Sequence, residues 1–254
     1  MSYIVVIPAR LDSSRLKGKV LADIAGKPLI AHVVDRANES EANRVIVATD
    51  HPSIAEALSE ANCEVCMTRS DHVSGSDRLA EVTDILDFDD QEIIVNVQGD
   101  EPLVPGKLID LVASSLELSG DAVMSTAAKP ITDVADLNNP NVVKVVFGRT
   151  GEAMYFSRAP IPYSVEAATN QVEQEPNSVI GWHHIGIYGY RAKFLRHHPK
   201  LIPSSLEQTE HLEQLRVLDN GDSILVETVD YDVGLGVDTQ ADLDYVRSVF
   251  ADRE

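Results

Sequence analysis

The sequence has few basic residues, few cysteines and no long apolar run, and each shortage excludes a class of protein. No apolar run approaches the roughly 20 residues that cross a bilayer. The first residues have neither the basic start nor the small-residue cleavage site of a signal peptide, so we expect a cytoplasmic protein without a membrane partner. The 21 Lys and Arg residues face 41 Asp and Glu residues, which is too little positive charge to bind a nucleic acid polymer.

The two cysteines, Cys63 and Cys66, form a C-x-x-C pair. Such a pair can be a redox couple or half of a zinc site, and the chain has no second pair to complete the zinc site. The pair lies in a strand pattern and not at a helix N-terminus, where a reactive thiol would be acidified. We therefore interpret both residues as reduced thiols of the core or of a sheet edge.

The first hundred residues alternate between strand and helix patterns. Hydrophobic residues make up 44% of the chain, enough for a sizeable core. The alternation predicts an α/β fold with a Rossmann-like, doubly wound and mostly parallel sheet. The expected strands are 3–9, 44–50, 64–68 and 92–98, and the expected helices are 27–40, 52–62 and 76–86.

The pattern changes after Pro105. Residues 142–148 and 153–160 flank a short polar turn, which predicts an antiparallel hairpin. A strand that continues into a helix is expected over 181–198, one helix over 205–221 and a strand over 223–230. The last helix is expected to begin at Asp238 or Thr239. We interpret the chain as a single domain with two halves, 1–105 and 106–254.

A positive loop follows the first strand. Residues 8–19 contain Arg10, Arg15, Lys17 and Lys19 in a chain whose net charge is -20. Neither G-x-G-x-x-G nor G-x-x-x-x-G-K-[ST] is present, so the common nucleotide fingerprints are absent. Ligands of open parallel sheets bind beyond the carboxyl ends of the strands. We therefore expect Arg15 and Lys19 to hold phosphate.

Carboxylates follow the fourth strand and precede the last helix. Asp100 lies in the turn Gln98–Pro102, where a carboxylate facing a phosphate loop suits a magnesium ion. Asp238 is either a second ligand or a plain helix cap, and spacing alone leaves both open. His183 and His184 point to opposite faces of a strand, so they are poor partners for one metal.

Three motifs are specific: VNVQGDEP at 95–102, HIGIYGYR at 184–191 and LEQLR at 212–216. A fourth, GKPLI at 26–30, is shared with many sugar nucleotidyltransferases. With these motifs the chain resembles the 3-deoxy-manno-octulosonate cytidylyltransferase family. The resemblance covers almost the whole chain. It implies a fold of the nucleotide-diphospho-sugar transferase type and a magnesium-dependent cytoplasmic homodimer. It also implies that CTP and the acidic eight-carbon sugar Kdo give CMP-Kdo and pyrophosphate for lipopolysaccharide biosynthesis.

The resemblance also implies the roles of individual residues. Residues 1–105 would bind CTP, and 106–254 would bind the sugar and form the dimer. The residues implied to bind nucleotide are Pro8, Ala9, Arg10, Arg15, Lys19, Arg78 and Gln98. Those implied to act in catalysis are Arg15, Lys19, Asp100 and Asp238, with Asp100 and Asp238 holding magnesium. Those implied to bind sugar are Arg158, His184, Tyr188, Glu213 and Gln214, although the helical pattern alone places Glu213 and Gln214 on the surface.

Two departures from the family leave alternatives open. Lys17 replaces the usual proline of R-L-P-G-K, and Ser76 replaces the threonine of S-G-T-[DE]-R. This divergence raises the hypothesis of a modified sugar, the 8-amino-3,8-dideoxy analogue of Kdo. Another acidic sugar, such as a sialic acid, is a further alternative. A catalytically silent nucleotide-binding regulator is the alternative from another class of protein.

Overall fold

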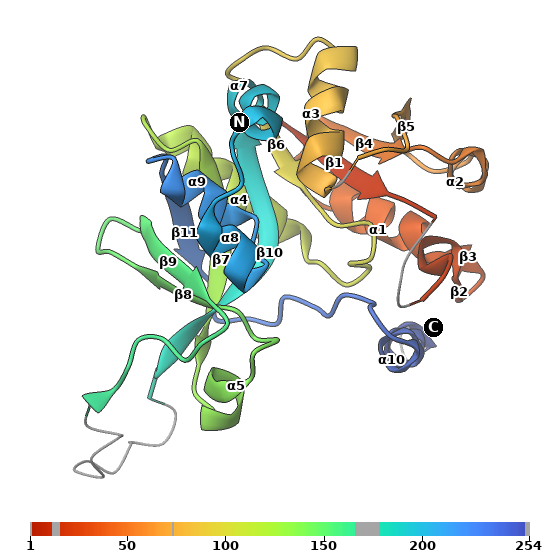
Figure 1. Ribbon diagram of the computed structural model, residues 1–254. Coiled ribbons are helices and arrows are strands. Elements are labelled where there is room, and N and C mark those ends of the chain that lie inside the picture. Colours follow the sequence, from red (N-terminus) through yellow and green to blue (C-terminus); the bar gives the residue numbers. More distant parts are fainter. Residues whose placement is uncertain (1, 12–15, 73, 166–177, 252–254) are drawn as a thin grey trace. The chain divides into compact units, whose positions relative to one another are not determined.

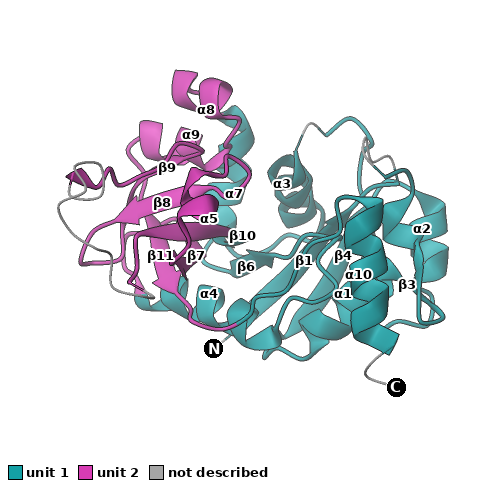
Figure 2. Ribbon diagram, turned by 90° about the horizontal axis from the view of Figure 1, so that it is seen from below, with its two compact units in different colours: residues 1–118, 187–200, 232–254 teal, residues 119–186, 201–231 magenta. Residues whose placement is uncertain are grey.

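The chain folds into two compact units, seen in a computed structural model that describes residues 2–11, 16–72, 74–165 and 178–251 (Figures 1 and 2). Unit 1 consists of residues 1–118, 187–200 and 232–254. Unit 2 consists of residues 119–186 and 201–231. These boundaries differ from the expected functional halves 1–105 and 106–254, whose roles stay a prediction. Arg15 lies outside the described residues.

Unit 1 contains the alternating strands and helices that the sequence predicts. Its strands are β1 (Tyr3–Ala9), β2 (Asp23–Ile24), β3 (Lys27–Pro28), β4 (Arg44–Thr49), β5 (Glu64–Met67), β6 (Ile93–Asn96) and the end of β10 (Gly181–Arg191). Its helices are η1 (Lys19–Leu21), α1 (Leu29–Asn38), α2 (Pro52–Ala57), α3 (Gly75–Ile85), α4 (Gly106–Leu118), α7 (Ala192–His197), η2 (His198–Lys200) and α10 (Gln240–Ala251).

The sheet of unit 1 is mostly parallel, which confirms the expected fold class. Strand β1 pairs in parallel with β4 on one side and β6 on the other, and β5 pairs in parallel with β4. Strand β10 pairs antiparallel with β6. The chain therefore reverses its direction of winding between β1 and β6. The loops that follow these two strands meet at this switch point, where ligands of such sheets bind.

Apolar side chains on both faces of this sheet form the core of unit 1. Residues 3–7 of β1 are fully or almost fully buried, and so are residues 93–95 of β6. Helices α1 and α3 lie on opposite faces of the sheet (Figure 2). Because both faces are covered, the strands are continuous apolar runs, as in other parallel sheets.

Unit 2 contains two strand pairs. Strand β7 (Met124–Ile131) pairs in parallel with β11 (Ile224–Thr228), and β8 (Lys144–Phe147) pairs antiparallel with β9 (Ala153–Ser157) as the expected hairpin. Strand β10 is hydrogen-bonded to both β7 and β8, so the two pairs belong to the same sheet. Its helices are α5 (Val134–Asn138), α8 (Ser205–Glu210) and α9 (Gln214–Asp219).

The prediction of a single helix over 205–221 is wrong, because the chain forms two short helices there. Helix α8 begins after Ser204, whose hydroxyl accepts a hydrogen bond from the Glu207 N–H at 3.0 Å. His211 then adopts a left-handed conformation with φ 53°, which ends α8. The hydrophobic period of the sequence continues across this break, so the pattern alone did not reveal it.

The C-terminal segment before α10 passes very close to the loop after β6. Gly234 has φ 82°, and a Cβ added there would lie 2.6 Å from the carbonyl oxygen of Leu103. Further along, the N–H of Val237 donates to the carbonyl of Asp100 at 2.8 Å. Only glycine meets both demands at position 234, and the close passage brings Asp238 beside Asp100.

Replacing this glycine should therefore cost more than its backbone angle alone explains. Gly26 is a matched control because it has φ 77° and nothing within 4 Å of an added Cβ. We expect Gly26→Ala to lower the free energy of unfolding by about 1 kcal/mol and Gly234→Ala by a further 1–3 kcal/mol or so. Urea unfolding of both variants measures the difference, and equal losses would contradict the close passage.

Candidate active site

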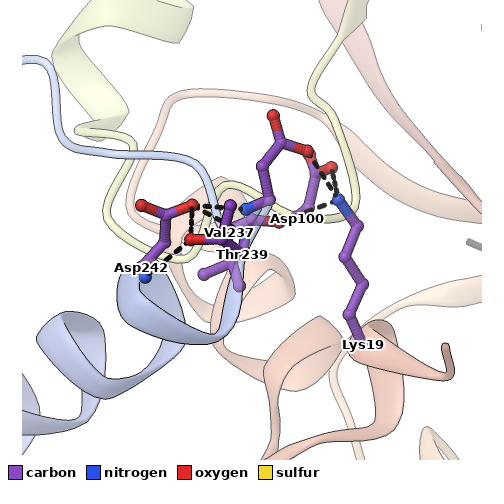
Figure 3. A network of polar contacts seen from close by, with 6 residues as sticks. Lys19, Asp100, Val237, Thr239 and Asp242 are labelled. Atoms are coloured by element: carbon purple, nitrogen blue, oxygen red, sulfur yellow. Dashed lines mark hydrogen bonds and ion pairs between the residues drawn. The ribbon is translucent and has the colours of Figure 1, made fainter. Parts of the chain in front are cut away.

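The Lys19 ammonium contacts Asp100 at the switch point of unit 1 (Figure 3), and it contacts Asp238 as well. Its Nζ is 2.5 Å from Oδ2 of Asp100, 3.1 Å from Oδ1 of Asp238 and 2.8 Å from the carbonyl oxygen of Val237. The Lys19 side chain is only 10% exposed. Three segments that are far apart in the sequence thus meet at one nitrogen atom.

A helix cap fixes the direction of the Asp238 segment. The Asp242 carboxylate accepts the N–H groups of Asp238 at 3.0 Å and Thr239 at 2.7 Å, together with the Thr239 hydroxyl at 2.9 Å (Figure 3). The Thr239 hydroxyl in turn accepts the Asp242 N–H at 3.3 Å. Thr239 is therefore the cap of α10, and Asp238 turns its carboxylate towards Lys19 instead.

Negative charge exceeds positive charge around this cluster. One ammonium group faces the carboxylates of Asp100 and Asp238, and Glu101 follows Asp100 in the chain. Burial, together with the charges of Asp100 and Asp238, raises the pKa of Glu101 to about 7 against the opposing effect of Lys19. A second positive charge would be strongly stabilised here.

The oxygen atoms around Lys19 fit a magnesium ion in their chemistry. Magnesium is usually held by one or two carboxylates together with substrate phosphates and water. Asp100 and Asp238 supply two carboxylate oxygens that converge on one cation position. Among the described residues there is no group of three or more His, Cys, Asp and Glu side chains that could hold a metal. These two carboxylates therefore need further oxygen ligands from a substrate.

A pocket lies at the ends of β1 and β6, beside the N-terminus of α3. Of the residues expected to bind nucleotide, it gathers Pro8, Ala9, Arg10, Arg78 and Gln98. Its other lining residues are His72, Ser74 and Gly75.

The walls of this pocket approach one another closely. A Cβ added to Gly99 would lie 2.8 Å from the carbonyl oxygen of Pro8. Position 99 therefore admits no side chain, which keeps the loops after β1 and β6 together.

Arg78 is held in place by two polar partners. Its guanidinium donates to Oγ1 of Thr68 at 2.5 Å and lies 3.6 Å from a carboxylate oxygen of Asp50. The residue is 4% exposed, so these contacts determine the direction of its side chain. Arg78 thus contributes a fixed positive charge to the pocket wall.

The sequence patterns did not reveal His72 as a lining residue of this pocket. Its Nε2 lies 2.5 Å from Oε2 of Glu81, which also accepts the backbone N–H of Arg69 at 2.9 Å. Burial opposes ionisation of Glu81, but these hydrogen bonds still lower its pKa. No spacing rule connects His72 with Glu81, because the contact depends on how the preceding loop folds onto α3.

The sequence patterns also did not identify Asn96 as a candidate site residue, although it interrupts the apolar strand β6. Its side chain is buried, and its Oδ1 has no hydrogen-bond partner among the described residues. Asn96 lies opposite Tyr188 in the ladder between β6 and β10. A polar residue within an apolar strand was the available signal. Tyr188, expected to bind sugar, is half-buried in unit 1.

Arg158 of unit 2 is fixed by a polar network around Glu210. The Glu210 carboxylate accepts the Ser157 hydroxyl at 2.6 Å and the Arg158 N–H at 2.9 Å. The Arg158 guanidinium donates to the carbonyls of Glu210 at 2.8 Å and Pro140 at 3.0 Å. Burial opposes ionisation of Glu210, yet these donors still lower its pKa.

Lys144 supports the same segment from the core of unit 2. Its ammonium donates to the carbonyls of Asn139 at 2.9 Å, Val142 at 2.6 Å and Arg158 at 2.6 Å, and the residue is fully buried. Burial lowers the pKa of Lys144, and the positive charge of Arg158 adds to this effect. The sequence patterns identified neither Glu210 nor Lys144, although a lysine within the apolar run 142–147 was a signal.

His184 is buried in unit 2, on the opposite side of the strand from a half-buried His183. Its Nε2 lies 3.0 Å from the hydroxyl oxygen of Thr126, and its ring packs edge-on against Phe156. Burial lowers the pKa of His184 to about 3, with a smaller contribution from His183. The ring is therefore held neutral at physiological pH.

Glu213 and Gln214 differ in their exposure. Glu213 is exposed, as the helical pattern predicts, but the same expectation for Gln214 is wrong, because Gln214 is 5% exposed. The Nε2 of Gln214 is buried without a hydrogen-bond partner among the described residues. A buried donor of this kind needs an acceptor, which a sugar hydroxyl can supply.

These features define a nucleotide-binding α/β enzyme, and comparisons with known proteins identify its family. The family model described as "Cytidylyltransferase" matches residues 4–224. A curated relative from Serratia proteamaculans, named 3-deoxy-manno-octulosonate cytidylyltransferase, is 54% identical over 97% of this chain and 98% of its own. A relative of the same name from Yersinia enterocolitica is 52% identical over the full length of both chains.

Solved structures agree with this assignment. The structure of a CMP:2-keto-3-deoxy-manno-octonic acid synthetase complexed with CTP matches with a TM-score of 0.90 at 38% identity, over the whole of both chains. A cytidylyltransferase from Leptospira borgpetersenii matches with a TM-score of 0.61 at 15% identity over 98% of this chain and 86% of its own, which supports the fold alone. The chain belongs to the 3-deoxy-manno-octulosonate cytidylyltransferase family of nucleotidyltransferase enzymes.

The buried His184 makes the stability of the protein depend on pH. Its pKa is about 3 in the folded chain and 6.5 in its ordinary state, so the unfolded chain binds the proton more tightly. The resulting stability is complete above about pH 6.5 and decreases as the pH falls towards 3. Between pH 7.5 and 5.5 this single group should lower the free energy of unfolding by about 1.4 kcal/mol.

Urea unfolding at these two pH values tests the effect. His184→Gln cannot titrate at this position. Its loss of free energy of unfolding between pH 7.5 and 5.5 should therefore be about 1.4 kcal/mol smaller than that of the wild type. His197→Gln changes an exposed histidine at the end of α7 and serves as the control, with the wild-type dependence expected. If His184→Gln retains the full wild-type dependence, the buried neutral ring is not its source.

Proposed function

We propose that the protein transfers the cytidylyl group of CTP to 3-deoxy-manno-octulosonate, giving CMP-Kdo and pyrophosphate. The observation that carries the proposal is the convergence of Lys19, Asp100 and Asp238 beside the pocket of unit 1. The sugar is inferred from the names of full-length relatives that are 52–54% identical. These names favour plain Kdo over the 8-amino analogue and over a sialic acid.

The residues of unit 1 are proposed to bind and orient CTP. Residues 8–10 and Gln98 line the pocket, where the fixed charge of Arg78 helps to hold the nucleotide. Arg15 and Lys19 supply positive charge for the triphosphate. Neutralising the phosphate oxygens stabilises charge that develops during transfer, and the bound orientation allows in-line attack.

Asp100 and Asp238 are the residues that would hold magnesium. When bound, the ion supplies charge neutralisation at the phosphates and lowers the pKa of a coordinated hydroxyl. The anomeric oxygen of the sugar forms a bond to the α-phosphorus of CTP, its proton passes to water, and the bond to the bridging oxygen breaks so that pyrophosphate leaves. This route needs no covalent enzyme intermediate.

The residues of unit 2 are proposed to recognise the sugar. Arg158 would meet its carboxylate, and Glu210 and Lys144 hold the Arg158 backbone for this purpose. Gln214 and Glu213 would bind hydroxyl groups, with the buried amide of Gln214 as donor. His184, and Tyr188 of unit 1, are proposed as further contributors to sugar binding.

The decisive assay measures pyrophosphate release from CTP, Kdo and magnesium. We expect release with Kdo, and a higher kcat/KM for Kdo than for the 8-amino sugar or a sialic acid. Release that is absent with every acidic sugar would favour the silent nucleotide-binding regulator. A clear preference for the 8-amino sugar would replace the proposed substrate while keeping the reaction.

Asp100→Asn should nearly abolish this reaction without unfolding the protein. The change removes the negative charge but keeps the size of the side chain, so kcat is expected to fall by about a hundredfold or more. Circular dichroism checks the fold. Near-wild-type turnover of Asp100→Asn at saturating magnesium would remove Asp100 from the metal site.

The setting of the enzyme is also part of the proposal. We propose a cytoplasmic homodimer that provides activated sugar for lipopolysaccharide biosynthesis. No helix among the described residues is long and apolar enough to cross a membrane. Unit 2 exposes apolar side chains, including Met154, Tyr163 and Ile202, that a second copy could cover.

Light scattering after size exclusion tests the oligomeric state. We expect a mass near twice the 27.7 kDa of the chain, because an exposed apolar surface favours association. A mass near 27.7 kDa at micromolar concentration would contradict the homodimer.

A further inference from the structure

The proposed task of Lys19 and that of the two aspartates conflict with the contacts that these groups make in the structure. As a phosphate ligand Lys19 must direct its ammonium towards the nucleotide, while Asp100 and Asp238 must direct their oxygens towards a metal. In the structure these groups bind one another, and all three N–H groups of the ammonium have an acceptor. The ammonium must therefore leave the carboxylates before both tasks can be performed.

We propose that Lys19 is an internal counter-cation that occupies the divalent cation position until the nucleotide binds. The metal then binds strongly only together with the nucleotide, whose phosphates take over the ammonium. The inference rests on the proposed function, and it assigns to Lys19 a second role, in setting the order in which the ligands enter.

The charges explain why the exchange occurs only with nucleotide. One ammonium compensates one of the two carboxylates and is already inside the cluster, so a metal ion entering alone must displace it into solvent. A triphosphate offers the displaced ammonium a polyanionic partner and gives the metal the further oxygen ligands that two aspartates lack. Both replacements are then favourable together.

Backbone hydrogen bonds hold the segments of the three residues, and the length of each side chain decides which charged group can move. Asp100 is tied through its carbonyl to the N–H of Val237, and Asp238 through its N–H to Asp242. The backbone of Lys19 is held as well, by hydrogen bonds to Leu16 and Ala22. Its ammonium, however, lies at the end of a flexible four-carbon stem, so it can move while the shorter carboxylate side chains stay in place.

Manganese binding without nucleotide tests the proposal directly. The free and bound Mn²⁺ is measured by electron paramagnetic resonance for the wild type, Lys19→Met and Lys17→Met. Lys17 is an exposed cation of the same loop, so its replacement changes the net charge equally without touching the cluster. We expect Lys19→Met to bind Mn²⁺ about tenfold more tightly than the wild type and Lys17→Met to stay within about twofold of it.

A double variant locates the metal. Lys19→Met combined with Asp100→Asn should lose the gain in Mn²⁺ affinity, because one of the two carboxylates is gone. If the double variant keeps the tight binding, the metal lies elsewhere and the proposal fails. It fails equally if Lys19→Met binds Mn²⁺ no more tightly than the wild type.

Thermal unfolding gives a second measurement that needs no enzymatic activity. Removal of the ammonium leaves two neighbouring carboxylates without their cation, so Lys19→Met should have a lower Tm than the wild type in EDTA. Mn²⁺ should then raise the Tm of Lys19→Met more than that of the wild type, and equal increases would contradict the exchange. Lys19→Gln, which retains hydrogen-bonding capacity, replaces Lys19→Met if the latter does not fold.

The outcome is separable from that of the proposed function. Pyrophosphate release by the wild type tests the reaction, whereas nucleotide-free Mn²⁺ binding tests only the competition between Lys19 and the metal. A protein that releases pyrophosphate but shows no gain in Lys19→Met is an active transferase without the internal counter-cation. A gain in Lys19→Met without pyrophosphate release would retain the cation exchange and overturn the reaction.

Discussion

The contact of Lys19 with Asp100 and Asp238 is the interaction on which the organisation of unit 1 depends. It joins the loop after β1, the loop after β6 and the segment before α10 at a single ammonium group. The close passage of Gly234 over Leu103 makes this meeting possible. Taking a lysine almost out of water is costly, and the cost is offset only because two carboxylates and a carbonyl surround it.

The same interaction connects stability with function. The ammonium of Lys19 allows the two carboxylates to lie close together in the folded protein. It neutralises only one of their two negative charges, so the cluster favours additional positive charge. A nucleotidyltransferase needs such a place, because its substrates bring phosphates that must be neutralised during transfer. In unit 2, by contrast, Glu210 and Lys144 hold the Arg158 backbone through hydrogen bonds that satisfy nearly every polar atom involved.

Part of the fold was predictable because the relevant signals are local. The apolar runs of β1, β4 and β6 and the helical spacing of α1 follow from burial on both faces of a parallel sheet. The helix expected over 205–221 was wrong because the left-handed turn at His211 leaves the hydrophobic period unbroken. Burial of Gln214 was missed for a related reason, since what covers a helix face is decided by residues elsewhere in unit 2.

Some residues of the candidate site could be predicted from the sequence and others could not. Asp100 could be identified as a candidate metal ligand from its turn after β6. The positive loop could be identified as a candidate phosphate site from its contrast with the acidic chain. His72 could not be identified as a site residue, because its contact with Glu81 depends on how the loop before α3 folds. Glu210 could not be identified either, because its partner Ser157 is distant in the sequence. Asp238 stands between these cases, since its spacing allowed both a helix cap and a ligand.

The sequence alone determined the alternating α/β pattern, the acidic surface and the motifs of the family, because these depend on residue type and local spacing. Only the tertiary structure decided that Thr239 caps α10, that Asp238 meets Asp100 and that one lysine binds both aspartates. The reason is physical: these outcomes depend on the path of the chain past Gly234 and on the sum of charges at one point. No local pattern encodes that sum.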